Sequence, residues 1–190
     1  MDEARQYQQQ VLDFWFGDMS APRPQWFVKD PAFDREIETR FGPLIEQALA
    51  GDCAHWLDGP RPALALVIVL DQFTRNVFRE TPRAFAGDPL ALAAARRIVA
   101  EGWDRELVPM ERWFCYLPFE HSEALADQQE SLRLFGQLRD DPQAGGAFQW
   151  AQSHHDVIER FGRFPHRNEI LGRESTPEEI EFLRQPGSRF

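Results

Sequence analysis

The sequence is poor in several features that would point to a function. Lys29 is the only lysine, so nearly all of the 21 positive side chains are arginines. The longest apolar run, residues 63–70, is far too short to cross a bilayer. Cys53 and Cys115 lie far apart and form no Cys-x-x-Cys pair, which excludes a disulfide framework and the common zinc motifs. The polar first ten residues do not resemble a secretory signal, so we expect a cytoplasmic protein.

The chain also lacks a surplus of basic side chains. Its formal net charge is −10, which argues against nucleic acid and against anionic membranes as partners, because both require a basic face. It contains neither a phosphate-binding loop nor a dinucleotide-binding fingerprint. We therefore expect no cofactor and no metal site, and the oligomeric state is not readable from the sequence.

What the sequence does contain is helical periodicity along its whole length. A chain of 190 residues fits one domain, residues 1–190, which is large enough to fold without disulfide or metal cross-links. No stretch alternates with a two-residue period for long enough to predict a strand. We expect short antiparallel helices packed in pairs. Caps and prolines place these helices at residues 4–16, 31–50, 63–79, 90–101, 110–117, 119–138, 147–161 and after 176.

A first polar cluster lies at the end of the apolar helix expected at residues 63–79. Asp71 and Arg75 are four residues apart with the acid first, so they can pair on the helix surface. Gln72 and Asn76 share the neighbouring stripe. Because the preceding turns are apolar all round, this cluster should lie near the core. A structural hydrogen-bond network and a functional site explain it equally well.

A second cluster follows Pro118, which we expect to divide two helices. Glu120, Glu123 and Asp127 are spaced by three and four residues, so one helical face would carry three carboxylates. The adjoining His121 adds an imidazole, and such a group suits acid–base chemistry. The spacings typical of helical metal sites are missing. A solvated acidic face is the structural alternative.

The third cluster, residues 160–168, is the most unusual segment. His154 falls on the apolar seam of the helix that leads into it, where a histidine is usually a hydrogen-bonded core residue. Gly162 should end that helix and Pro165 should prevent its continuation, so we expect an ordered turn. The polar side chains of this segment are those of Arg160, Arg163, His166, Arg167 and Asn168. They either neutralise the acids at 120–123 or converge on an anionic small molecule.

Four strings together resemble the mostly bacterial family known as domain of unknown function 924. They are VLDFWF at residues 11–16, LDQFTRNVFR at 70–79, YLPFEHSE at 116–123 and FGRFPHRNEILGRESTPEE at 161–179. The resemblance implies an all-α fold of tetratricopeptide-like helix pairs in a right-handed superhelix, and the family has no established activity. The chain shows no 34-residue repeat, so this likeness would be one of helix packing. Thr74 stands where proline is more usual.

The polar residues of the family's motifs can be carried over position by position. In this chain they are Asp71, Gln72, Arg75, Asn76, Glu120, His121, Glu123, Gln128, His154, Arg160, Arg163, His166, Arg167 and Asn168.

We expect these clusters to form one site for a small anionic ligand, and the sequence leaves open whether it is enzymatic. Arg75, Arg163 and Arg167 would clamp the anion. The acid–base candidates are His121, His154, His166 and Glu120. The further ligand-binding candidates are Asp71, Gln72, Asn76, Glu123, Arg160 and Asn168. Two alternatives stay open, namely a tetratricopeptide-like module that binds a protein or peptide, and an internal network that only fixes the fold.

Overall fold

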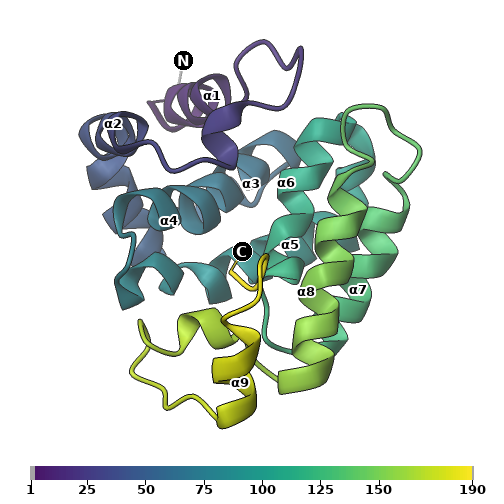
Figure 1. Ribbon diagram of the computed structural model, residues 1–190. Coiled ribbons are helices and arrows are strands. Elements are labelled where there is room, and N and C mark those ends of the chain that lie inside the picture. The colour runs from purple at the N-terminus through teal and green to yellow at the C-terminus, as the bar shows by residue number, and fades with distance from the viewer. Residues whose placement is uncertain (1–2, 190) are drawn as a thin grey trace.

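The computed structural model describes residues 3–189, and within this range the regular structure is entirely helical (Figure 1). The longer helices are α1 (Glu3–Phe16), α2 (Pro31–Leu49), α3 (Pro60–Val67), α5 (Asp88–Ala100), α6 (Pro109–Glu120), α7 (Leu125–Gly136) and α8 (Ala147–Phe161). The shorter elements are η1 (Pro24–Trp26), η2 (Ala54–Trp56), η3 (Ile68–Phe73), α4 (Thr74–Val77), η4 (Pro82–Phe85), η5 (Trp103–Glu106), η6 (Pro165–Arg167) and α9 (Pro177–Phe182).

Local signals in the sequence set several helix ends. The Asp30 carboxylate accepts hydrogen bonds from the backbone N–H groups of Ala32 and Phe33, which caps α2. Thr176 forms a capping box at the start of α9. Gly162 ends α8 in the left-handed conformation with φ of 68°, where a side chain would be strained.

The central helix differs in detail from the one expected at residues 63–79. It begins earlier, at Pro60, because a proline in the first turn gives up no helical hydrogen bond. It then passes from α3 into a π-helical turn, η3, before the short α4. All six side chains of η3 are buried, including the polar side chains of Asp71 and Gln72. A π-helical turn inside a helix is a frequent mark of a functional segment.

The expected break at Pro118 is wrong. Helix α6 continues through Pro118 and ends at Glu120, and residues 121–124 connect it to α7. The amide of Gln128 on α7 explains where α6 ends, since its Nε2 donates to the carbonyl oxygens of Glu120 (2.6 Å) and Ser122 (2.7 Å). A side chain distant in sequence thus satisfies carbonyl groups that a helix end leaves without partners.

Neighbouring helices pack against one another around a large apolar core. Helix α7 packs on both α6 and α8, while α3 packs on α1, α5 and α6 (Figure 1). A second, smaller apolar cluster joins Val157, Ile158 and Phe164 near the C-terminal segment. The right-handed tetratricopeptide-like superhelix stays a prediction.

Among residues 3–189, no helix combines the length and the apolar character that a membrane crossing requires.

Candidate functional site

A buried carboxylate and an imidazole form the centre of the site. Asp71 lies on η3, and His121 follows the last residue of α6. The Nδ1 atom of His121 lies 2.7 Å from Oδ1 of Asp71. The side chain of Asp71 is 1% exposed and that of His121 is 15% exposed, so the imidazole is the member of the pair that reaches solvent. Gln72 donates to the other oxygen, Oδ2, of Asp71 at 2.6 Å.

The surroundings set the protonation states of this pair. Burial by itself raises the pKa of Asp71, but Arg75 and His121 outweigh burial and hold that pKa below its usual value. Burial lowers the pKa of His121, with Asp71 acting in the opposite direction. At neutral pH we therefore expect an ionised carboxylate beside a neutral imidazole. Because the carboxylate only accepts hydrogen bonds, Nδ1 of His121 must carry the proton and Nε2 is the basic nitrogen.

Arg75 links Asp71 to a second acid, Asp88. Its Nη1 lies 3.1 Å from Oδ1 of Asp71, as the four-residue spacing predicts. Two further hydrogen bonds, of 2.7 and 3.1 Å, reach both oxygens of Asp88 in the bidentate geometry that suits a guanidinium. The start of α5 can lie this close to η3 because Gly87 has no side chain: a Cβ atom at residue 87 would lie 2.1 Å from the carbonyl oxygen of Leu70.

Arg167, on the C-terminal segment, lies beside Asp88 and His121. It is 6% exposed, and its guanidinium carbon lies 4.6 Å from the ring centroids of both Phe85 and Phe164. Nη2 donates to the carbonyl oxygen of His121 at 3.0 Å, and Nη1 makes a long contact of 3.4 Å with Asp88. Its Nε–H is buried and has no acceptor within residues 3–189. Burial, followed by the repulsion from Arg75, lowers the pKa of Arg167 to about 10.

Glu120 and His154 form a second buried acid–imidazole contact. The Nδ1 atom of His154 lies 3.2 Å from Oε1 of Glu120 and 2.9 Å from the carbonyl oxygen of Trp150. Burial, then the negative charge of Asp71, raises the pKa of Glu120 well above its usual value, which favours the protonated carboxyl group. Burial lowers the pKa of His154 to about 3. Burial thus favours the neutral form of both side chains. The ring of His154 lies 6.2 Å from that of His121.

We refer to these residues together as the polar centre. It consists of Asp71, Gln72, Arg75, Asp88, Glu120, His121, His154 and Arg167.

The other arginines and Asn168 of the third cluster bond within the C-terminal part of the chain. Arg163 forms a bidentate pair with Glu179 at 2.6 and 2.8 Å, so its guanidinium is already engaged by a carboxylate of this chain. Arg160 is half exposed and pairs with Glu178. Asn168 donates to Ser175 and to Glu179 and accepts from Arg173. These side chains hold the segment after α8 together, because these partners all lie between residues 173 and 179.

Three further candidates also lie outside the polar centre. Asn76 donates to Asp34 of α2 at 2.7 Å. Glu123 accepts from the backbone N–H of Phe164 and from Arg173, which fastens the C-terminal segment beside the centre. His166 immediately precedes Arg167, its ring lies 5.7 Å from that of Phe164, and burial lowers its pKa to about 3.

The expected face of three carboxylates does not exist. Glu120 ends α6, Glu123 lies in the connection, and Asp127 lies on α7, where it pairs with Arg96. The periodicity argument failed because it assumed one continuous helix across residues 119–138.

Sequence reasoning missed Asp88. Asp88 is the first residue of α5, directly before Pro89, and α5 has no side-chain cap hydrogen bond. Its carboxylate instead joins Arg75 and Arg167. The signal available was an acid at a helix start with Gly87 before it, which does not reveal a partner thirteen or seventy-nine residues away.

A further group of metal-binding residue types lies on α8, away from the polar centre. Possible ligand atoms of His155, Asp156 and Glu159 all lie within 4.8 Å of one another, and both acids are exposed. Exposed acidic groups of this kind are common on helices, and we assign no role to this group.

Comparison with known proteins places the chain in a family. The model of a family described as a bacterial protein of unknown function (DUF924) matches residues 11–187. The chain belongs to this family. The matched range contains all four strings that carried the resemblance, so that resemblance is confirmed.

A solved structure of a similar protein supports the fold. The structure of a protein of unknown function, ATU0120, from Agrobacterium tumefaciens is similar to this chain with a TM-score of 0.85 and 40% sequence identity. The similarity covers 95% of this chain and 98% of that one. No curated protein matches the chain. The DUF924 match thus shows the bacterial family, and the solved structure supports the all-helical fold.

Proposed function

We propose that the polar centre binds a small anionic molecule and that His121 acts on it as a general base. The observation that carries this proposal is the contact of 2.7 Å between His121 and Asp71, in which the carboxylate is fully buried and the imidazole is partly exposed. A buried acid that orients a solvent-facing imidazole is the arrangement by which enzymes hold one basic nitrogen toward a substrate.

Arg167 supplies the reason to expect an anion. Even with its lowered pKa of about 10, the guanidinium is charged at neutral pH. A buried charged donor without an acceptor costs more than a neutral one, which itself costs roughly 1–3 kcal/mol. A carboxylate or phosphate oxygen would satisfy the Nε–H of Arg167 next to His121.

Among the arginines of the polar centre, Arg167 is the one available to bind an anion. Arg75 already shares its guanidinium between Asp71 and Asp88, whereas the contact of Arg167 with a carboxylate of the polar centre is the long one of 3.4 Å to Asp88. Two arginines and two aspartates balance, and Glu120 is neutral. We infer that the ligand carries a single negative charge or that its binding displaces Asp88 from Arg167.

Glu120 is the candidate general acid of this site. Its raised pKa keeps a proton on the carboxyl group at neutral pH, and its Oε2 has no hydrogen-bond partner among the described residues. A protonated carboxyl group near a basic imidazole resembles the paired acid and base of proton-transfer enzymes.

Two further features support a cytoplasmic protein that binds a small molecule rather than a peptide. Cys53 and Cys115 are both free and buried, which suits a reducing compartment such as the cytoplasm. Two hollows of the surface, one beside α1 and one beside α2, are lined mostly by charged and polar side chains and by no aromatic residue, so they do not favour the peptide-binding alternative.

Anion binding is tested by thermal shift with acetate, malonate and inorganic phosphate. An anion present at a hundred times its Kd should stabilise the fold by about 2.7 kcal/mol, which raises the Tm by roughly 5–10 °C for a chain of this size. Arg167→Gln should abolish the shift. Arg160→Gln, an exposed arginine outside the centre, is the matched control. Equal shifts in both variants, or no shift in the parent protein, would contradict anion binding at Arg167.

The role of His121 is tested by long-range ¹H–¹⁵N NMR of its ring. We expect a neutral ring with the proton on Nδ1, and we expect Asp71→Asn to disturb that tautomer. A proton on Nε2 in the parent protein would turn the basic nitrogen, Nδ1, toward Asp71 and away from the ligand, and would rule out general-base action at Nε2 even if anions bind.

A further inference from the structure

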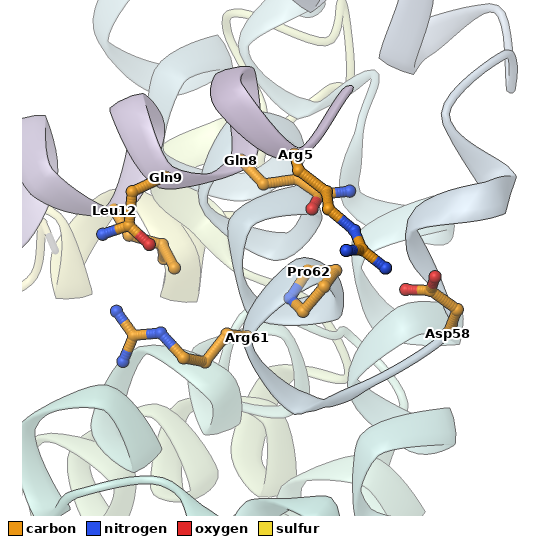
Figure 2. Close-up of a pocket in the computed structure, with 7 residues that line it drawn as sticks. All are labelled: Arg5, Gln8, Gln9, Leu12, Asp58, Arg61 and Pro62. Carbon is orange, nitrogen blue, oxygen red and sulfur yellow. The ribbon is translucent and has the colours of Figure 1, made fainter. Parts of the chain in front are cut away.

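A second candidate site lies between α1 and the start of α3, and it shares no residue with the polar centre. A hollow of about 360 Å³ opens there, within the size range of small-molecule sites. Arg5, Gln8, Gln9 and Leu12 of α1 line one wall, and Asp58, Arg61 and Pro62 line the other. Figure 2 shows Arg5 and Asp58 at one end, Arg61 and Gln9 at the other, and Pro62 between the ends.

The first indication of a ligand is the polar group that Gln8 presents to the hollow. Its side chain lines the hollow, and its carboxamide forms no hydrogen bond with any residue of the range 3–189. The residue is only 8% exposed, and the part that solvent reaches includes its amide atoms. The Gln8 amide thus offers a donor and an acceptor to whatever occupies the hollow.

The second indication is a pair of opposite charges that do not meet. In Figure 2 the guanidinium of Arg5 and the carboxylate of Asp58 face one another across the opening. Neither forms an ion pair within the described part of the chain. One end of the hollow therefore presents a cation and an anion that are both available to a ligand.

Arg61 provides the other end. Its Nη1 donates to Oε1 of Glu111 at 2.5 Å, and the side chain of Glu111 is only 3% exposed while that of Arg61 is 47% exposed. A buried carboxylate thus orients a guanidinium whose remaining N–H groups are accessible. Leu12 and Pro62 give the hollow an apolar surface between its two polar ends.

We propose that this hollow binds a small zwitterion of the amino-acid class with an acidic side chain. Asp58 would accept the α-ammonium group, and Arg5 with Gln8 would bind the α-carboxylate. Leu12 and Pro62 would contact the methylene groups, and Arg61 would bind the side-chain carboxylate. A simple anion would leave Asp58 without a partner, and a simple cation would leave Arg5 without one.

Isothermal titration calorimetry of the full chain with L-glutamate tests this assignment. We expect binding of one molecule per chain. Glutarate lacks the ammonium group and 4-aminobutyrate lacks the α-carboxylate, and each should bind about tenfold more weakly or worse, because each loses a charge-assisted hydrogen bond. L-Glutamine should bind more weakly than L-glutamate if Arg61 recognises the side chain.

Variants at exposed positions locate the binding. Asp58→Asn and Arg5→Gln should each weaken L-glutamate binding about tenfold without changing the Tm of the free protein, because neither residue has an ion-pair partner to lose. Arg105→Gln and Asp140→Asn, exposed residues outside the hollow, are the matched controls. The proposal would be overturned by the absence of a heat of binding with 10 mM L-glutamate, by affinities for the two truncated analogues equal to that for L-glutamate, or by unchanged binding in both hollow variants. None of these outcomes bears on anion binding at Arg167.

Discussion

The buried imidazole of His154 should make the protein sensitive to mild acid. Burial, followed by the repulsion from His121, lowers the pKa of His154 to about 3 in the folded chain, against 6.5 for an ordinary histidine. Below pH 6.5 the unfolded chain takes up a proton that the folded chain refuses. The free energy of unfolding must therefore fall as the pH falls from 6.5 toward 3.

The size of this effect follows from the two pKa values. Between pH 6.5 and pH 4.5 one such histidine removes about 2 kcal/mol from the free energy of unfolding. His154→Gln removes the titrating group, so the variant should lose about 2 kcal/mol less than the parent protein over this interval. Urea unfolding at half-unit steps of pH measures both curves.

The neighbours of His154 decide the controls. Glu120, His121, His166 and Arg167 face or adjoin it. Glu120 acts in the opposite direction, because its raised pKa stabilises the fold at low pH and this contribution is lost as the pH rises. The comparison is therefore repeated in a Glu120→Gln background. His55→Gln, at an exposed histidine, is the matched control. Parallel curves for the parent protein and His154→Gln in both backgrounds would refute the reasoning.

Two further substitutions test how the polar centre is built. Asp88→Asn should lower the free energy of unfolding by about 1.5–3 kcal/mol, because Arg75 loses a bidentate charge-assisted pair; urea unfolding measures it, and a loss below about 0.5 kcal/mol would mean that the pair contributes little. Gly87→Ala should cost about 1–3 kcal/mol, because its Cβ would meet the carbonyl oxygen of Leu70; Gly146→Ala, where no atom lies within 4 Å, should show no such loss, and equal effects of the two would contradict the steric argument.

The features that could be predicted from the sequence are local ones. The cap at Asp30, the capping box at Thr176 and the end of α8 at Gly162 depend on residues a few positions apart. The pairing of Asp71 with Arg75 is local in the same sense, because helix geometry brings them together.

The features that could not be predicted are contacts between distant segments. Periodicity shows which side chains share a face of one helix, but it does not show which faces meet. The contact between Asp71 and His121, which are fifty positions apart, could therefore not be predicted from residue spacing. The same holds for the position of Asp88 between two arginines. The end of α6 was missed for the same reason, since Gln128 from the next helix supplies its cap.

The π-helical turn η3 fixes the length of the chain in this region. Side chains along an α-helix are offset by about 100° per residue. A π-helical turn takes in one residue more than an α-helical turn, so a deletion that restores ordinary α-helix leaves the faces of the flanking helices in nearly the same direction. The side chains within the turn would be redirected, and Asp71, the fourth of its six residues, is one of them. A single deletion in Ile68–Phe73 should therefore spare the packing of α3 on α5 and still move the Asp71 carboxylate away from the imidazole of His121.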